Sequence, residues 1–419
     1  MSPNRSAPDL AAPDLAAVDL PAVDLPAPDL DRLQRVAAAL AARAAEHDRD
    51  ASFPYEGVAA VHEARLLTAT VGRAHGGPGA GLADTVRILQ ALGGGDPAVA
   101  LVTAMTLFTH AAQARNGAWP QPAYEQLLAA SAGGPVLVNA LRVEPDLGSP
   151  VRGGLPATVA RHRGDHWELT GHKIFSTGAE ALGRMLVWAR TDEATPRVGS
   201  FLVQPGSPGL TVLPTWNHLG LRASRSDDVR LDAVAVPLGD VIALAAPATD
   251  GGRDVVGGAW NALGLTALYL GVARAAQHWL IGFLHQRTPT ALGAPLATLP
   301  RFQTAVGEID TALTGAERLV GALARATDQG DAAAAEDAGA AKVIGTRAAI
   351  GAVEQAVALI GNHGLTHDNP LQRHLRDVLC SRVHTPQDDM VLLTAGRAAL
   401  ARRTSDPVAI STPTATEGS

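Results

Sequence analysis

The sequence predicts a mainly α-helical protein with a small β domain between two helical regions, because three textures follow one another along the 419-residue chain. Apolar residues recur at helical spacing from residue 31 to about residue 134. Residues 135–240 instead form short extended segments separated by turn residues such as Gly164-Asp165. From residue 252 to 402, long alanine-rich segments are again helical. We therefore expect an N-terminal helical domain, a central β-barrel-like domain and a C-terminal four-helix bundle.

The spacing of apolar residues also predicts the individual elements. Leu33, Val36 and Leu40 fall on one helix face, and the run 99–112 is typical of a buried helix. Strands are expected at 136–138, 158–161, 166–169, 185–189, 200–203, 210–213 and 229–231. Helices are expected in the last region at 255–286, 299–327, 332–360, 371–382 and 388–402.

Both ends of the chain have the composition of disordered tails. In residues 1–30 an Asp-Leu pair recurs every five residues, a period that matches neither helix nor strand. The prolines in this repeat forbid a continuous helix, so we expect a solvated tail, with a short docking segment as the alternative. Residues 403–419 are rich in Thr, Ser and Pro and are also expected to be disordered.

Composition argues against several classes of function. The net charge is −7 and basic residues do not cluster, so neither a nucleic acid nor an anionic membrane is expected as a partner. The single cysteine, Cys380, excludes an internal disulfide and a cysteine-rich zinc site. No metal site is expected, because His363 and His367 have no carboxylate cluster nearby. Without an apolar run long enough to span a membrane or a secretory signal, we expect a cytoplasmic protein.

One glycine-rich loop, residues 76–81, precedes an expected helix and permits two interpretations. It could cradle a phosphate at the helix N-terminus. It follows no clear strand and lacks the lysine of a P-loop, so a plain turn between helices is favoured.

Three motifs carry a family resemblance. They are ELTGHKIFSTG at 168–178, LGLRASRS at 219–226 followed by VRLDAVAVP at 229–237, and GNHGL at 361–365 followed by Arg376-Asp377. In this order and spacing, residues 50–402 resemble the acyl-CoA dehydrogenase superfamily of flavoproteins. The resemblance implies FAD or FMN as cofactor, bound near a subunit interface of a homotetramer or homodimer.

The same resemblance assigns cofactor-binding residues. Phe175 would lie against the flavin ring, while Ser176 and Thr177 would face its polar edge. Arg287 would reach the cofactor's pyrophosphate in a neighbouring subunit; a surface arginine is the alternative. Gly361, Gly364 and Arg376 belong to the third cofactor-associated motif. The loop EPDLGS at 144–149 only partly matches the family, which leaves room for FMN or loosely bound FAD.

The sequence departs from ordinary acyl-CoA dehydrogenases at the catalytic base. These enzymes use a glutamate to remove a proton next to the thioester carbonyl. Of its two known positions, one, nine residues after Arg376, is Thr385, and the other, ten residues before Gly271, is Asn261. Neither side chain is a base, so α,β-desaturation is not the expected reaction.

The stretch VHTPQDD at 383–389 instead resembles the monooxygenase branch of the superfamily, which includes dibenzothiophene monooxygenase. This resemblance implies reduced flavin from a separate reductase, molecular oxygen, a flavin hydroperoxide and a small-molecule substrate oxygenated at sulfur, nitrogen or aromatic carbon. Candidate catalytic residues are His384, Ser176 and His110. A helix-capping role is the alternative for His384, and a core histidine is the favoured alternative for His110.

Two other functions stay open. An acyl-CoA dehydrogenase with a displaced base would use Glu308 or Glu354. A noncatalytic scaffold would retain the fold without the chemistry.

Overall fold

The structure is a computed structural model that describes residues 27–146, 154–247 and 254–401. Most of the two predicted tails therefore lies outside the described residues. The first helix, α1 (Ala27–Asp50), begins four residues earlier than expected, so the predicted tail was too long at this end. Pro28 does not prevent this start, because a helix has no intrahelical acceptor for the amides of its first turn.

The N-terminal domain is helical, as predicted. Its helices are α1, α2 (Tyr55–Glu63), α3 (Leu82–Gly95), α4 (Pro97–Asn116) and α5 (Gln121–Gly133). Asp96 caps α4, since its carboxylate accepts the Ala98 amide at 2.8 Å, and Pro97 fits the first helical position. Gly117 ends α4 in the left-handed conformation.

The middle domain is one twisted sheet. Its strands are β1 (Leu137–Leu141), β2 (Val159–His162), β3 (His166–Lys173), β4 (Leu182–Thr191), β5 (Val198–Val203), β6 (Leu210–Leu213), β7 (Asp228–Pro237) and β8 (Val241–Ala245). Their order is β6-β7-β3-β2-β4-β5-β8, and β1 pairs with β4. Strand β8 was not predicted, and it extends the domain past the expected boundary at residue 240. It pairs with β5, an interaction between strands that are far apart in sequence and that local patterning does not reveal.

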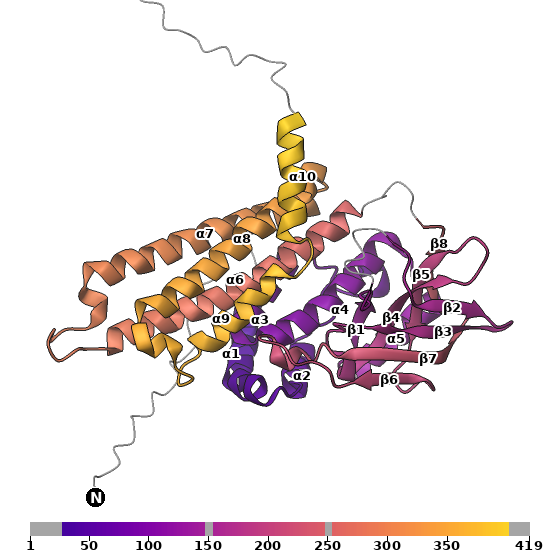
Figure 1. Cartoon of the computed structure of the whole chain (residues 1–419), viewed down its shortest axis with the longest axis horizontal. Helices are drawn as coiled ribbons and strands as arrows, with labels where there is room; N and C mark the ends of the chain where they lie inside the picture. The colour runs from indigo at the N-terminus through magenta and orange to yellow at the C-terminus, as the bar shows by residue number, and fades with distance from the viewer. Residues whose placement is uncertain (1–26, 147–153, 248–253, 402–419) are drawn as a thin grey trace, which may run out of the picture.

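The C-terminal region is the expected bundle. Its helices are α6 (Val255–Gln286), α7 (Pro300–Asp328), α8 (Ala332–Leu359), α9 (Leu371–Leu379) and α10 (Asp388–Ala401). Figure 1 shows α6, α7, α8 and α9 side by side on one side of the molecule and the sheet on the other, with α10 projecting away. Helix α6 is long and apolar enough to cross a membrane by length and composition alone, but most of it is buried against other helices.

Close contacts join the N-terminal domain to the bundle. A Cβ atom on Gly271 of α6 would lie 2.1 Å from the Gln90 carbonyl oxygen of α3, so these helices touch backbone to backbone. At the other end of α3, Asp328 of α7 accepts the amides of Leu82 and Ala83 at 2.7 and 2.9 Å. A protein carboxylate thus occupies the helix N-terminus after the glycine-rich loop. The favoured turn interpretation agrees with this contact, and the phosphate cradle does not.

Candidate active site

The segment after β3 presents one aromatic ring to solvent and buries two hydroxyl groups. Phe175 is 57% exposed and has a φ of 55°, in the left-handed region that bulky residues seldom adopt. Ser176 is buried, and its hydroxyl has no hydrogen-bond partner among the described residues. The buried Thr177 hydroxyl accepts a hydrogen bond from Ser226 at 3.2 Å. An exposed ring beside an unused buried hydroxyl fits a flat aromatic ligand with a polar edge.

The three sequence motifs meet beside this segment. The bond between Thr177 and Ser226 joins the first motif to the second. The second joins the third where the Leu221 amide donates to Asp377 at 2.7 Å. A Cβ atom on Gly220 would lie 2.3 Å from the Arg376 carbonyl oxygen, so this close approach requires glycine. Residues far apart in sequence therefore build one site.

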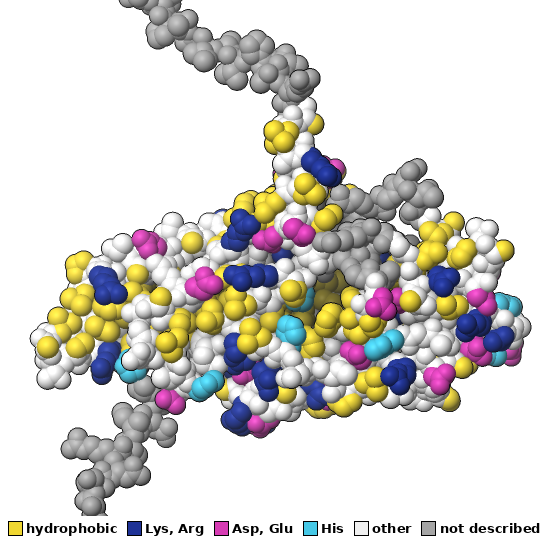
Figure 2. Space-filling view, in the orientation of Figure 1, with side chains coloured by type: hydrophobic (Ala, Val, Ile, Leu, Met, Phe, Trp, Pro, Cys, Tyr) yellow, Lys and Arg dark blue, Asp and Glu magenta, His cyan; other side chains and the backbone are white. Residues whose placement is uncertain are grey.

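A row of rings, which the sequence did not predict, leads from Phe175 toward the bundle. The Phe175 and Trp216 rings meet edge to face at 6.3 Å, and Trp216 stacks on His218 at 4.3 Å. The His218 Nδ1 atom lies 3.9 Å from the Cys380 sulfur, at the end of α9. The row links the β domain to the segment that carries His384. Figure 2 shows the molecular surface hollowed between the bundle and the β domain, next to histidine side chains.

The two positions that the family resemblance assigns to the catalytic glutamate are in contact. Asn261 lies near the start of α6, and Thr385 lies just before α10. The Asn261 amide donates to the Thr385 carbonyl oxygen and, at 3.1 Å, to the Thr385 hydroxyl. The structure therefore brings together the two residues that counting along the sequence singled out, and their match to the base positions stays a prediction. An amide and an alcohol occupy them, and neither can remove a proton from carbon.

His384 lies beside this pair. Its ring is 5.8 Å from the Tyr269 ring, and no ring hydrogen bond to a helix carbonyl is present among the described residues. Burial, together with the charges of Lys342 and His218, lowers the pKa of His384 to about 4. The imidazole is therefore neutral near pH 7, with one nitrogen as donor and the other as acceptor.

Lys342 is a nearby residue that the sequence analysis missed. It is buried in α8, and its Nζ atom donates to Asp388 at 3.0 Å, where α10 begins. This ion pair fixes the chain that carries His384 and Thr385. The available signal was composition: Lys342 and Lys173 are the only lysines in the sequence, while arginine supplies every other strong base.

His110 lies apart from these residues, in the core of the N-terminal domain. Its Nδ1 atom is 2.9 Å from the Tyr124 hydroxyl of α5, and burial lowers its pKa to about 4. Its Nε2 atom has no partner among the described residues. The contacts with Tyr124 favour the core-histidine alternative.

A second group of predicted residues lies at the far end of α6. Arg287 is exposed and follows α6 directly, 26 positions after Asn261, which is about 39 Å at 1.5 Å per residue. The nearby turn at 361–365 contacts the same end, since His363 packs on Phe283 at 5.4 Å. In this turn Gly361 has a φ of 59°, and a Cβ atom on Gly364 would lie 2.3 Å from the Val357 carbonyl oxygen. These residues cannot share a site with Asn261 within one subunit.

Arg376, also predicted to bind cofactor, is engaged by protein groups. Its guanidinium donates to both carboxylate oxygens of Asp48, at 2.9 and 2.5 Å. It also donates to the Leu219 carbonyl oxygen at 2.9 Å and to the Gln372 side chain. The structure therefore shows Arg376 tying α9 to α1 and to the second motif.

Glu144, in the loop that only partly matches the family, has a structural partner. Its carboxylate accepts Lys173 at 2.5 Å and the Thr158 hydroxyl at 2.5 Å. Both members of the ion pair are buried, with side chains 2% and 0% exposed. The pair joins the segment after β1 to β3. The Glu144 carboxylate is therefore engaged by protein groups.

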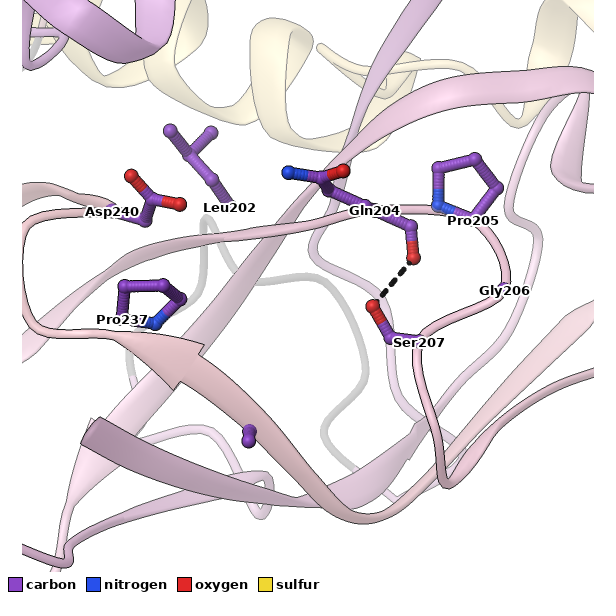
Figure 3. A pocket seen from close by; sticks show the side chains of 8 residues that line it. Leu202, Gln204, Pro205, Gly206, Ser207, Pro237 and Asp240 are labelled. Carbon is purple, nitrogen blue, oxygen red and sulfur yellow. Dashed lines mark hydrogen bonds between the residues drawn. The ribbon is translucent and has the colours of Figure 1, made fainter.

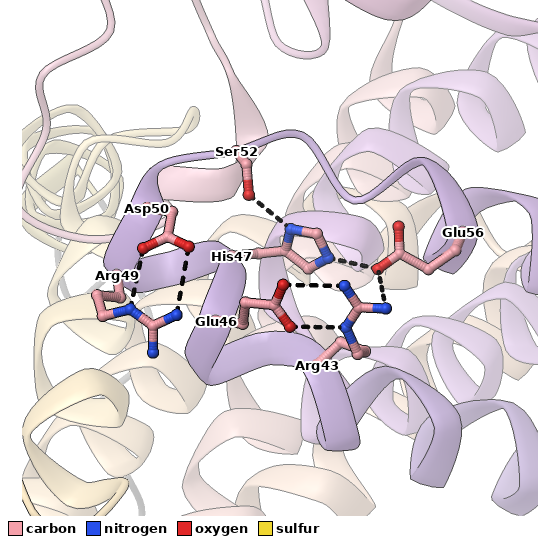
Figure 4. A network of polar contacts seen from close by, with 7 residues as sticks. All are labelled: Arg43, Glu46, His47, Arg49, Asp50, Ser52 and Glu56. Atoms are coloured by element: carbon pink, nitrogen blue, oxygen red, sulfur yellow. Dashed lines mark hydrogen bonds and ion pairs between the residues drawn. The ribbon is translucent and has the colours of Figure 1, made fainter.

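Two cavities lie outside this site. One of about 310 Å³ opens between the ends of β5 and β7, where Figure 3 shows Gln204, Ser207 and Asp240 at its edge. Another of about 70 Å³ lies between α1 and α2, beside the network around His47 that Figure 4 shows. Within the described ranges, no three His, Cys, Asp or Glu side chains gather in a way that could hold a metal ion.

The fold and the convergence of the motifs on Phe175 and Ser176 define a three-domain flavoprotein. Family models agree: the N-terminal, middle and C-terminal domains of acyl-CoA dehydrogenase match residues 31–118, 142–234 and 263–388. The chain belongs to the acyl-CoA dehydrogenase family, whose members are flavin-dependent oxidoreductases. The predicted family and fold class are thus confirmed.

Two relatives and two solved structures represent different activities within this family. The putative acyl-CoA dehydrogenase YdbM of Bacillus subtilis is 30% identical over 87% of this chain and 94% of its own. The amino sugar nitrososynthase DnmZ of Streptomyces peucetius is 30% identical over 83% of this chain and 87% of its own. KijD3, solved with FMN and an amino-keto sugar nucleotide, is 27% identical with a TM-score of 0.78, covering 91% and 95% of the two chains. TdsC, a dibenzothiophene monooxygenase of Paenibacillus sp. A11-2 solved with FMN, is 20% identical with a TM-score of 0.80, covering 90% and 98%, and shows the shared fold.

Proposed function

We propose that this chain is a reduced-flavin-dependent monooxygenase that oxygenates a small organic substrate at sulfur, nitrogen or an aromatic carbon. The contact between Asn261 and Thr385 carries this proposal, because the place of the dehydrogenase base holds only neutral groups. The similarity to DnmZ and to KijD3 supports it and favours nitrogen among the three kinds of atom.

The residues around Phe175 suit a flavin. The Phe175 ring would form one wall, and the unused Ser176 hydroxyl and the Thr177 backbone would meet the polar edge of the isoalloxazine. A reduced flavin bound there supplies two electrons to molecular oxygen, one atom of which enters the substrate while the other leaves as water. FMN and FAD are both compatible with these groups.

The remaining site residues would orient the substrate and hold protons. The neutral His384 imidazole can donate one hydrogen bond at the reacting oxygen, and the Asn261 carbonyl oxygen and Thr385 can fix a polar substrate group. The ion pair between Lys342 and Asp388 holds His384 in place and helps to exclude water. In this proposal His110 does not touch the substrate, and its role would be limited to its contact with the Tyr124 hydroxyl.

Partners follow from the same proposal. The chain would take reduced flavin from a separate reductase and act in the cytoplasm as a homodimer or homotetramer. Arg287, exposed at the far end of α6, would then reach the flavin of a neighbouring subunit. The exposed leucines of α10, Leu392, Leu393 and Leu400, would be covered by another subunit.

The competing dehydrogenase function has one observation in its favour, the similarity to YdbM. The contacts of the two glutamates that could serve as a displaced base do not support such a role. Glu308 is exposed and accepts a hydrogen bond from Gln355, and Glu354 is exposed opposite Arg382. Asp388, the carboxylate nearest Thr385 in sequence, is paired with Lys342 and Arg347.

Anaerobic titration with reduced FMN and reduced FAD, followed by mixing with oxygen, tests the proposal. We expect saturable binding of a reduced flavin, and Phe175→Ala should weaken it about tenfold by removing an aromatic wall. Leu238→Ala, an exposed apolar residue at the other end of the β domain, is the control and should bind normally. Absence of binding in both redox states would instead favour a noncatalytic scaffold.

A further inference from the structure

Tyr269 has a buried phenol side chain next to the candidate active site. It lies in α6 about two turns after Asn261, and its ring is 5.8 Å from that of His384. The side chain is fully buried, yet its hydroxyl has no hydrogen-bond partner among the described residues. A buried tyrosine hydroxyl normally has one, so this group calls for an explanation.

Other unpaired polar atoms come from the neighbouring helix. Arg373, Asp377 and Ser381 follow one another at intervals of four residues along α9 and the turn after it, so they share one face. All three are buried, and the Arg373 Nε and Nη1 atoms and the Ser381 hydroxyl have no partner among the described residues. Helix α9 packs against α6, and burial, together with the charges of Cys380 and Asp377, raises the pKa of the Tyr269 phenol. Such a group of buried donors and acceptors is typical of sites that hold ordered water.

We propose that Tyr269 and Asp377, bridged by ordered water, form a path that brings one proton per turnover to His384. This inference rests on the proposed monooxygenase function. With the reduced flavin as a monoanion, FlH⁻ + O₂ + S + H⁺ gives Fl + SO + H₂O, where S is the substrate. The flavin supplies both electrons, and the remaining proton comes from solvent. A reaction site closed to bulk water needs a defined route for that proton.

Asp377 is suited to receive this proton near neutral pH. Burial raises its pKa to about 7, while Arg373 and the Leu221 amide act in the opposite direction. The other groups that face it are Arg376 and Cys380 on its own element, Tyr269 from α6 and Asp48 from α1. Of these, Arg376 and Asp48 reach solvent, with side chains 22% and 14% exposed, and mark the outer end of the path. Tyr269 stays protonated and can donate toward His384.

The kinetic test uses Tyr269→Phe and Asp377→Asn, with Tyr55→Phe as the control. Tyr55 is an exposed tyrosine of α2 whose hydroxyl donates to Glu180 and not to a group of the proposed path. Each protein is loaded anaerobically with reduced FMN and mixed with oxygen, and flavin reoxidation and H₂O₂ release are followed against pH. Without substrate the balance is FlH⁻ + O₂ + H⁺ giving Fl + H₂O₂, so the same proton is required. We expect both variants to slow reoxidation at least about tenfold and Asp377→Asn to remove the pH dependence near 7.

Two measurements on the flavin-free protein test the path independently of activity. A high-resolution crystal structure should contain water within hydrogen-bond distance of the Tyr269 hydroxyl and the Asp377 carboxylate. Tyr269→Phe should lower the urea midpoint, because it removes a hydrogen-bonded hydroxyl; removing one that is truly unpaired would leave the midpoint unchanged or raise it. The affinity of the Tyr269→Phe variant for reduced flavin should stay within about twofold of the wild-type value.

The possible failures are distinguishable. If wild-type protein binds no reduced flavin, the proposed function fails. If wild type binds and reoxidises flavin while Tyr269→Phe matches it in rate, pH profile and urea midpoint, the proton path is wrong and the function stands. A dry cavity in the crystal structure would also overturn the path.

Discussion

Replacing Arg376 with alanine separates a structural role from direct cofactor binding. The side chain makes two charge-assisted hydrogen bonds to Asp48, at 2.9 and 2.5 Å, and one to the Leu219 carbonyl oxygen at 2.9 Å. Removing one partner of a buried ion pair costs about 3–5 kcal/mol. These side chains are 22% and 14% exposed, so solvent screening reduces the expected loss to about 2–3 kcal/mol. Because the ties connect α9, α1 and the second motif, the loss should occur in protein without flavin.

Urea unfolding of the flavin-free protein, followed by tryptophan fluorescence, measures this loss. Arg347→Ala is the matched control, since Arg347 is 60% exposed and reaches Asp388 only at 3.4 Å. It should cost about 0.5 kcal/mol or less. Arg376→Lys should not restore stability, because lysine cannot bind Asp48 through two parallel hydrogen bonds. Equal stability of Arg376→Ala and the control, together with weaker flavin binding, would refute this reasoning and support a direct cofactor contact.

Two further predictions concern single residues. Burial lowers the pKa of His110 from 6.5 to about 4, so above pH 6.5 the imidazole is neutral in both the folded and the unfolded protein. As the pH falls from 6.5 to 4, the unfolded state takes up the proton first. The free energy of unfolding therefore decreases by up to about 3 kcal/mol over this range. His110→Gln should remove that part of the acid sensitivity in urea unfolding at pH 7.5 and pH 4.5, and an unchanged difference between the two pH values would contradict the assignment. Asp328→Ala should lower the free energy of unfolding by about 1 kcal/mol, because the Leu82 and Ala83 amides lose the carboxylate that caps α3. Asp328→Asn should retain much of the wild-type stability, since an amide oxygen can also accept from these amides. Equal thermal stability of wild type and Asp328→Ala would show that the cap contributes nothing.

Much of the fold follows from local sequence signals. The boundaries of α6 match the prediction because an N-cap, Asp254, precedes an unbroken apolar helix. Strand β8 was missed because its pairing with β5 is a long-range interaction. The start of α1 was placed too late because proline was taken to end a helix, although it is tolerated in the first turn.

The residues of the candidate site also divide into those that the sequence indicated and those that it did not. Counting from motif residues singled out Asn261 and Thr385, and the structure brings this pair into contact; their match to the family's base positions stays a prediction. The roles of Arg376 and Lys342 depend on Asp48 and Asp388, partners 328 and 46 residues away that spacing cannot reveal. The rings of Trp216 and His218 lie between motifs and carry no periodic signal.

The most direct test of the missing base is to mix anaerobic protein, loaded with oxidised FAD or FMN, with acyl-CoA thioesters of several chain lengths. We expect the visible absorbance of the flavin to persist in the wild-type protein, because neither Asn261 nor Thr385 can remove the α-proton. Thr385→Glu, which places a carboxylate at one of the two positions, serves as the comparison. Bleaching of the wild-type flavin by any acyl-CoA would contradict the account and return the chain to desaturation chemistry.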